Sequence, residues 1–172
     1  MKRILLIILA LALCLPVFSG CAEKAIDATA ADVQLPVVPT IFPFEPPHLF
    51  ISDDKSAIEA WRGTSSWFTE SDDGMGSGVN SDSMHPLDCK DRLPILEMTK
   101  KSTVSLHFEA APSKITVKRY KLNATDYDNY EEIAVSGNSF EAKAGDYVYE
   151  IIASWNDQYY SGTVHYAFRT EK

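Results

Sequence analysis

Apolar and polar residues alternate along much of the chain after residue 50, and a period of two predicts β-strands. Val104, Leu106 and Phe108 share one face of the first clear strand. The strongest pattern lies near the C-terminus, where apolar residues alternate over 147–155 and again over 164–168. Because a short polar stretch joins these two segments, they predict a long β-hairpin with Trp155 on its inward face.

Shorter apolar segments predict the remaining strands. At Tyr120 the apolar positions change to the other face, which predicts a β-bulge after residue 118. About seven or eight short strands separated by turns are typical of an all-β antiparallel sandwich. The other predicted segments lie at residues 57–68, 93–98, 115–118, 130–135 and 140–144.

The segment Ser71–Ser83 differs from its surroundings. It contains glycine, serine and aspartate without periodicity, which predicts a mobile loop. Oxygen ligands for calcium are available there, but their spacing does not match that of an EF-hand. We therefore predict a solvated acidic loop, with no metal and no other cofactor. The possible calcium ligands are Asp72, Asp73, Asn80 and Asp82.

The N-terminal residues 1–20 have the order of an export signal. Residues 1–3 give a positive start, an apolar run extends over 4–18, and two small residues precede Cys21. A membrane span needs roughly 20 apolar residues, and this run is shorter and interrupted by Pro16. We expect a cleaved signal, with an uncleaved membrane anchor as the alternative.

The residues Val17-Phe18-Ser19-Gly20-Cys21 resemble the lipobox of bacterial lipoproteins, with Phe18 where an aliphatic residue is usual. The resemblance implies cleavage before Cys21 and acyl chains, such as palmitate, that hold the mature chain on the extracytoplasmic face of the cell membrane. Each buried methylene contributes about 0.8 kcal/mol, so several chains anchor stably. In a host with two membranes, Ala22 permits delivery to the outer membrane. The alternative is ordinary secretory cleavage near Gly20, which leaves a free thiol.

Residues 21–50 are predicted to be a tether. Prolines are dense between Pro36 and Pro47, which favours extended polyproline II. Apolar residues between the prolines indicate that part of the tether lies against the domain as an edge strand. The predicted organisation is a signal at 1–20, a lipidated cysteine and tether at 21–50, and a β-sandwich domain at 51–172.

Gly145-Asp146-Tyr147-Val148-Tyr149 resembles the tyrosine corner of immunoglobulin-like domains, with Tyr149 at the position of the usual cysteine. The resemblance implies an immunoglobulin-like sandwich without the cross-sheet disulfide; an ordinary glycine turn is the alternative. The Trp61–Trp67 segment, His85-Pro86-Leu87 and the C-terminal hairpin are together similar to a group of poorly characterised bacterial envelope lipoproteins. That similarity implies an envelope location and assigns no catalytic residues.

Charge and cysteine content narrow the classes of partner. The chain carries 16 basic and 24 acidic residues, a net charge of −8. Because Lys2 and Arg3 leave with the signal, the mature chain has a net charge of −10. A negative surface disfavours nucleic acid as a partner. Cys89 is the one unmodified cysteine expected in the mature chain, so we predict no internal disulfide and a thiol that is either buried or reactive, burial being the commoner fate.

Residues suited to catalysis do not form a recognisable constellation. His85 and Cys89 lie four positions apart with Asp82 and Asp88 nearby, but nothing in the sequence orients a catalytic base. We therefore expect a protein that is not an enzyme. Zinc needs three or four converging ligands, and the histidines are scattered. They are His48, His85, His107 and His165, of which the last two lie on outward faces and approach each other only if their strands pair.

Aromatic residues give the main indication of binding. Trp61, Trp67, Tyr159 and Tyr160 exceed what one small core needs, so we expect them to form an accessible surface, with one of the two tryptophans outside the core. Packing against the proline-rich tether is the alternative use of these rings. The leading hypothesis is a lipid-anchored binding module of the cell envelope that binds an envelope protein or glycan through the aromatic hairpin tip and the loop Ser71–Ser83.

Two alternatives to the binding module remain open. One is an envelope enzyme that acts on cell-wall material through Asp82, His85 and Asp88. The other is a structural subunit that packs on another envelope protein.

Overall fold

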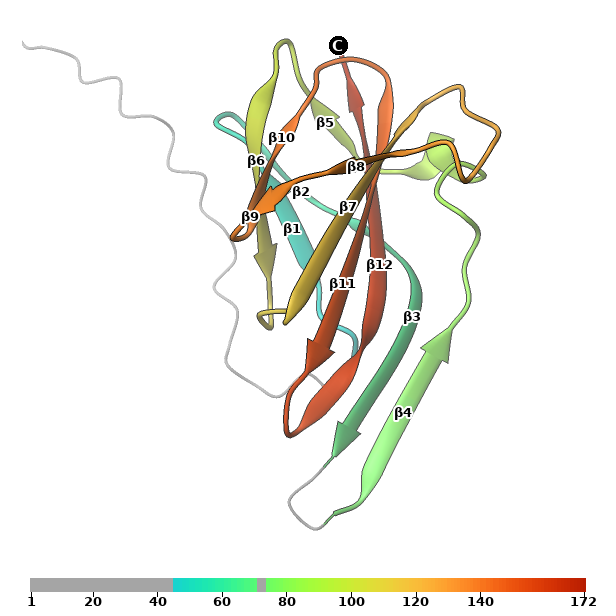
Figure 1. The fold of residues 1–172 in the computed structure, drawn as a ribbon, viewed down its shortest axis with the longest axis vertical. Helices are drawn as coiled ribbons and strands as arrows, with labels where there is room; N and C mark the ends of the chain where they lie inside the picture. Colours follow the sequence, from blue (N-terminus) through green and yellow to red (C-terminus); the bar gives the residue numbers. More distant parts are fainter. Residues whose placement is uncertain (1–44, 71–73) are drawn as a thin grey trace, which may run out of the picture. The chain divides into compact units, whose positions relative to one another are not determined.

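The computed structural model describes residues 45–70 and 74–172, which form two β-sheets packed face to face (Figure 1). This arrangement confirms the predicted all-β sandwich. Among these residues no helix is long and apolar enough to cross a bilayer. The predicted export signal, Cys21 and most of the predicted tether lie in residues 1–44, outside the described residues.

The smaller sheet has five strands in the order β2-β1-β6-β10-β9. Strand β6 carries the predicted alternation, with Val104 and Leu106 buried. Strand β1 lies between β2 and β6, so the end of the predicted tether forms an internal strand and not an edge strand. The strands are β1 (Leu49–Ser52), β2 (Ala57–Glu59), β6 (Ser102–Phe108), β9 (Val135–Ser136) and β10 (Ser139–Ala142).

The larger sheet has the order β4-β3-β12-β11-β7-β8, and β5 adds to β12 in parallel. The predicted C-terminal hairpin is confirmed as β11 and β12, which pair from Tyr147↔Thr170 to Asn156↔Ser161. The strands are β3 (Trp61–Glu70), β4 (Gly76–Ser81), β5 (Ile95–Glu97), β7 (Lys114–Lys121), β8 (Glu131–Ile133), β11 (Tyr147–Asn156) and β12 (Tyr160–Glu171), with a 3-10 turn at Lys90–Arg92.

The strand predicted at 130–135 is divided between the two sheets. Its first part, β8, pairs with β7, and its second part, β9, pairs with β10. The chain therefore passes from the larger sheet to the smaller one at Ala134.

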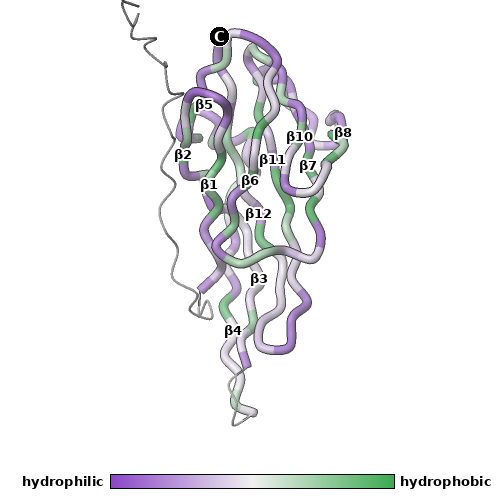
Figure 2. The backbone as a smooth tube through the Cα atoms, turned by 90° about the vertical axis from the view of Figure 1, so that its left-hand side faces the viewer, coloured by the Kyte–Doolittle hydropathy of each residue, from purple (hydrophilic) through white to green (hydrophobic). Residues whose placement is uncertain are grey.

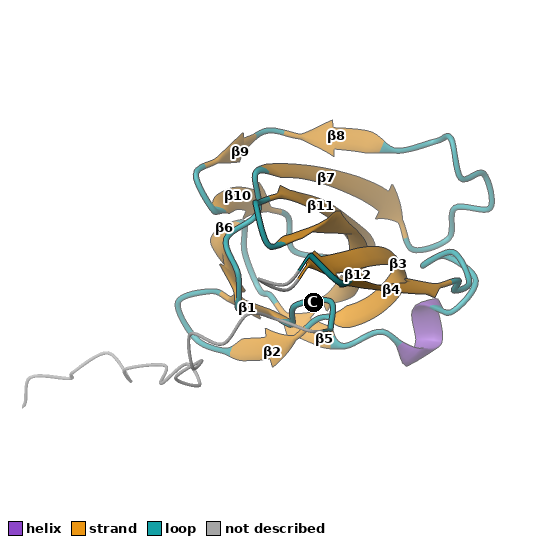
Figure 3. Ribbon diagram, turned by 90° about the horizontal axis from the view of Figure 1, so that it is seen from below, coloured by secondary structure: helices purple, strands orange, loops and turns teal. Residues whose placement is uncertain are grey.

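The main core fills the space between the two layers, which Figure 3 shows end on. Along the strands, hydrophobic residues alternate with hydrophilic ones (Figure 2), as the period of two requires. Trp155 faces inward as predicted, and its Nε1–H donates to the Ala110 carbonyl at 2.9 Å. Burying one such large side chain contributes about 1.5–3 kcal/mol.

A second apolar cluster lies on the outer face of the larger sheet. Residues 82–94, which we call the strap, cover this face and bury apolar side chains of their own against it. The strap is also tied to the sheet through the Arg169 N–H, which donates to the Pro94 carbonyl at 2.9 Å. The cluster consists of Leu87, Cys89 and Leu93 from the strap and Tyr120, Val148 and Ala167 from the sheet.

The strap explains why the predicted bulge in β7 is wrong. Strand β7 pairs with β11 without interruption from Lys114 to Lys121. Its apolar positions change faces because both faces are covered: Val117 faces the main core and Tyr120 faces the strap. A strand buried on both sides loses the simple alternation of a half-buried one.

The bulge of the larger sheet lies in β3. The pairing of β3 with β12 shifts between Arg62 and Ser65. Trp61 and Trp67 are six positions apart and would share one face of a regular strand. The shift places Trp61 against the strap and Trp67 in the main core. The expectation that regular alternation places the two tryptophans on opposite faces is therefore wrong; the bulge separates them, and Trp61 packs in the second cluster.

The prediction of a mobile loop at 71–83 is wrong for its central part. Residues Gly76–Ser81 form β4, which pairs with β3 over its whole length. The glycines are used for close packing, since a Cβ on Gly76 would lie 2.2 Å from Cζ of Phe68. The ring of Phe68 therefore lies directly on the backbone of β4. Residues 71–73, which include two of the possible calcium ligands, lie outside the described residues.

The described end of the tether lies against the domain, as predicted. The Tyr166 hydroxyl donates to the Pro47 carbonyl at 2.6 Å, and the Arg62 guanidinium donates to the Pro46 carbonyl. Strand β1 then begins at Leu49, inside the range predicted as tether.

Candidate functional site

The structure does not assemble the predicted aromatic surface as a whole. Trp67 is 2% exposed and packs edge-on against Trp155, with ring centroids 5.3 Å apart, so it is a core residue. Trp61 is partly buried against the strap. Tyr160 stacks on Trp67 at 5.5 Å, and both Tyr159 and Tyr160 are partly accessible. A binding role for these two tyrosines stays a prediction.

The residues of the enzyme hypothesis are only partly brought together. Tyr127 joins His85 and Asp88: its ring stacks on His85 with centroids 4.1 Å apart, and its hydroxyl donates to Asp88 Oδ2 at 2.6 Å. Asp82 is exposed and lines a different groove, which it shares with His165.

Cys89 is a buried free thiol, the commoner of the two states that the sequence left open. Its Sγ lies 3.6 Å from the backbone carbonyl of His85, and the His85 ring is engaged elsewhere, because its Nδ1 accepts the Leu87 N–H at 3.2 Å. Burial raises the pKa of the Cys89 thiol. A thiol that ionises less readily and has no base beside it is poorly suited to act as a nucleophile.

Glu150 forms the centre of a polar network on the outer face of the larger sheet, which sequence reasoning missed. The residue is 4% exposed. Its carboxylate accepts the Tyr120 hydroxyl at 3.0 Å and lies 2.9 Å from Nδ1 of His165. Burial by itself raises the pKa of Glu150, but these two hydrogen bonds lower it overall. The apolar residues Val148 and Ile152 on the same face of β11 are the sequence signal that this face is covered.

The histidines do not converge on a shared site. His107 lies in the smaller sheet, where its Nε2 is 2.8 Å from Oγ of Ser52. His165 lies in β12 of the larger sheet, so the pairing that would bring these two histidines together does not occur. Within residues 45–70 and 74–172, no three histidine, cysteine or acidic side chains are grouped to hold a metal ion.

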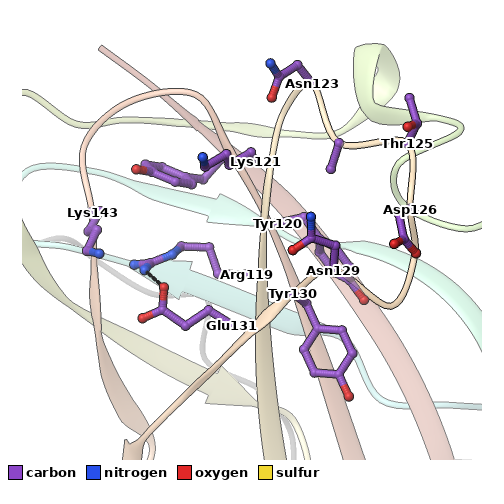
Figure 4. Close-up of a pocket in the computed structure, with 12 residues that line it drawn as sticks. Arg119, Tyr120, Lys121, Asn123, Thr125, Asp126, Asn129, Tyr130, Glu131 and Lys143 are labelled. Carbon is purple, nitrogen blue, oxygen red and sulfur yellow. Dashed lines mark hydrogen bonds and ion pairs between the residues drawn. The ribbon is translucent and has the colours of Figure 1, made fainter.

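A pocket of about 510 Å³ opens at the end of β7, between the loop 122–130 and the turn from β10 to β11 (Figure 4). We call it the Arg119 pocket. An adjoining pocket of similar size shares some of its wall, so the hollow continues past the end of β7. The side chains that define its chemistry are Arg119, Lys121, Asn123, Asn129, Tyr130 and Lys143.

Strand pairing places the charged groups of the Arg119 pocket. Arg119 and Lys121 are two positions apart in β7 and share one face. Glu131 lies opposite Arg119 in β8, and Tyr147 lies opposite Lys121 in β11. The loop between β7 and β8 supplies the amides of the opposite wall, and it is braced by Asp126, whose carboxylate accepts the Asp128 N–H at 2.9 Å.

Arg119 is a buried cation. Its side chain is 4% exposed, it forms an ion pair with Glu131, and it lies 5.0 Å from the ring centroid of Tyr147. Burial by itself lowers the pKa of Arg119, but hydrogen bonds with Tyr149 and Glu131 raise it overall, so the guanidinium keeps its charge. The arginine therefore sets a permanent positive charge in the floor of the pocket.

Lys143 is positioned by the element predicted to be a tyrosine corner. The Lys143 N–H donates to the Tyr149 hydroxyl at 2.8 Å. A corner tyrosine contacts the backbone a few residues upstream in the same way. In this chain Tyr149, which occupies the position of the usual cysteine, makes the contact. Tyr147, which occupies the position of the corner tyrosine, lies over Arg119 instead.

No family model, curated protein or solved structure matches this chain. The function proposed below therefore depends on the sequence pattern and on the geometry of the site.

Proposed function

We propose that the protein is a lipid-anchored binding module of the bacterial cell envelope that holds its ligand in the Arg119 pocket. The observation that carries the proposal is the composition of this pocket: amides, cations and a tyrosine line one cavity of about 510 Å³. Ligand sites are typically about 300–1,000 Å³ in volume and combine a few placed polar groups with aromatic walls.

The lipid anchor in this proposal is at Cys21, after cleavage of the signal at residues 1–20. It is supported by the order of positive start, apolar run and small residues before the cysteine. The module would then lie on the extracytoplasmic face of the cell membrane, or on the outer membrane of a host that has two. Its ligand would be an envelope glycan or an envelope protein.

We also propose that the sandwich is immunoglobulin-like. Its support is the strand order: β1-β6-β10-β9 corresponds to strands A-B-E-D, and β8-β7-β11-β12 corresponds to C′-C-F-G. In this correspondence β2 to β5 are an insertion between the first two strands, and β3, β4 and β5 enlarge the sheet beside the last strand.

Binding is tested by co-sedimentation of the native lipoprotein with protein-free cell-wall glycan from its host. Tyr130→Ala removes a ring that is 40% exposed in the pocket wall, and Phe68→Ala removes a ring that is 45% exposed on β3. We expect Tyr130→Ala to weaken retention by roughly tenfold and Phe68→Ala to leave it unchanged. No retention of the wild type, or equal retention of all three proteins, contradicts the proposal.

The anchor is tested separately with radiolabelled palmitate. We expect label in the wild type and in Cys89→Ser, and none in Cys21→Ser, because the two cysteines differ in their position relative to the signal. An intact Met1 in the mass spectrum of the native protein would contradict cleavage and anchoring together.

A further inference from the structure

We propose that the ligand of the Arg119 pocket is an acidic saccharide whose carboxylate lies between Lys121 and Lys143. This inference rests on the proposed function, because it names the ligand class of the same pocket. Three features carry it: the excess of positive charge on one wall, the amides on the other, and the exposed ring at the rim.

The charged wall holds three cations and one carboxylate. In Figure 4 Lys143 lies beside the Arg119 guanidinium, and Lys121 lies above it. Arg119 is paired with Glu131, and neither lysine forms an ion pair with any described residue. Like charges gathered around a buried guanidinium repel one another, and an anion placed between them offsets this repulsion.

The positive wall is a local exception on an acidic protein, whose net charge is −8. The other carboxylate of the pocket, Asp126, accepts a backbone N–H within its own loop and so braces the amide wall. A long polyanion would extend from the pocket onto a protein of net negative charge and be repelled. The distribution of charge therefore favours a short ligand with few anionic groups.

The amide wall indicates that the ligand is rich in hydroxyl groups. Asn123 and Asn129 each offer an N–H₂ donor and a carbonyl acceptor. A sugar hydroxyl needs both kinds of partner, since it donates one hydrogen bond and accepts others. An acidic peptide presents its carboxylates without such a dense set of hydroxyls, so it uses this wall less well.

Tyr130 supplies a face on which a sugar ring can stack. Its ring is 40% exposed and points away from the cationic wall in Figure 4. The Nζ of Lys118 lies 4.4 Å from its centroid, and the Tyr120 ring lies at 5.8 Å. An aromatic face combines a large apolar area with little loss of side-chain freedom. The volume of about 510 Å³ lies within the usual range for ligand pockets, so the pocket suits a short saccharide.

The test is calorimetric titration of the native lipoprotein, in neutral detergent at low salt, with trigalacturonate and with its methyl ester. The ester keeps the rings and hydroxyls and removes the charge. We expect the acid to bind at least roughly tenfold more tightly than the ester, since losing a charge-assisted contact costs about that factor. Equal affinity for the two compounds would overturn the assignment of an acidic ligand.

Paired variants test the position of the carboxylate. Lys121→Ala with Lys143→Ala should weaken binding of trigalacturonate by roughly tenfold or more. Lys55→Ala with Lys100→Ala removes the same charge from exposed turns elsewhere and should leave affinity unchanged. Lys121→Arg with Lys143→Arg keeps the charge and should retain most of the binding. The proposal is overturned if the double variant at Lys121 and Lys143 binds trigalacturonate as tightly as the double variant at Lys55 and Lys100, with folding of both intact by circular dichroism.

A third titration separates saccharide from peptide. Triglutamate carries carboxylates without hydroxyls, and binding as tight as that of trigalacturonate would overturn the saccharide class in favour of an acidic peptide. Absence of any binding of trigalacturonate overturns the ligand class as well. If cell-wall glycan is still retained through Tyr130 in that case, the binding module stands; loss of both contradicts both proposals.

Discussion

The inner face of the larger sheet packs Trp67, Tyr149 and Phe168 against the smaller sheet, whereas its outer face holds Glu150 and Tyr120 under the strap. Both faces are buried. The inner face is closed by a second sheet and is mainly apolar, with Ser65, Arg119 and Thr170 as its buried polar residues. The outer face is closed by an irregular segment and contains a buried carboxylate with its hydrogen-bond partners.

This difference means that the two faces respond to different changes. On the inner face, stability depends on the volume and apolar area of each side chain. On the outer face, removing one polar group leaves its partners unpaired in a place that water reaches poorly. The inner face should therefore be sensitive to truncation and insensitive to pH, and the outer face should be sensitive to both.

The largest effect is expected for Trp67→Ala on the inner face. Trp67 is 2% exposed and contacts the rings of Trp155 and Tyr160. Truncation of a buried tryptophan leaves a cavity and should reduce the free energy of unfolding by about 3–5 kcal/mol. Urea unfolding followed by far-UV circular dichroism measures this loss without using tryptophan fluorescence.

The neighbouring residue on β3 provides the control. Phe68 faces the other way and is 45% exposed, so Phe68→Ala should change the free energy of unfolding by less than about 1 kcal/mol. A similar loss for both variants would show that the inner face owes no special stability to this tryptophan.

A smaller loss is expected for Glu150→Ala on the outer face. The substitution leaves the Tyr120 hydroxyl and the His165 ring without their shared acceptor. The free energy of unfolding at neutral pH should fall by about 2 kcal/mol. Glu150→Gln keeps an acceptor for Tyr120 and should lose less, which urea unfolding of the two variants compares directly.

The stability difference between wild type and Glu150→Gln should also depend on pH. The pKa of Glu150 is lowered on folding, so its contribution is present above its ordinary value of 4.5 and is lost as the pH falls through the folded pKa. The difference in stability between wild type and Glu150→Gln should therefore shrink at acid pH. A difference that stays constant from pH 7 to pH 3 would show that the carboxylate charge does not stabilise the outer face.

Tyr120→Phe should have a smaller effect still, because it removes one hydrogen bond and keeps the ring in place. The expected loss in the free energy of unfolding is about 1 kcal/mol. In the double variant with Glu150→Ala the two losses should be less than additive, since each removes the same contact. Additive losses in urea unfolding would mean that the hydroxyl and the carboxylate act independently.

Much of the inner face could be predicted from the sequence. Val104 and Leu106, and the long hairpin that ends at Trp155, alternate with a period of two because one side of each strand is buried. The same rule fails wherever both sides are covered. At Tyr120 it predicted a bulge that is absent, and in β3 it could not reveal the shift that separates Trp61 from Trp67.

The candidate site was less accessible to sequence reasoning for a related reason. Arg119 and Lys121 lie in β7, whereas Lys143 comes from the turn before β11, and only the pairing of β7 with β11 brings these segments together. Nothing in their sequence spacing gives that proximity. The available signal was local: a basic segment at 118–121 followed directly by the asparagine- and tyrosine-rich segment 123–130.

The smallest effect sharpens the comparison, because His85 belongs to the strap on the outer face of the larger sheet. Burial lowers the pKa of His85, although Glu150 and Asp88 act to raise it. The geometry agrees, since protonation would place a proton on Nδ1, which accepts the Leu87 N–H at 3.2 Å. A group whose pKa is lowered on folding is protonated first in the unfolded chain, so stability should decline as the pH falls below 6.5.

His85→Phe tests this decline while keeping a ring against Tyr127, on which His85 stacks at 4.1 Å. Urea midpoints measured at pH 7.5 and pH 5 should differ less in the variant than in the wild type. Part of the difference should persist, because burial also lowers the pKa of His107 in the smaller sheet. An unchanged difference would mean that the strap tolerates a charged His85, and that the outer face is held by its apolar contacts as the inner face is.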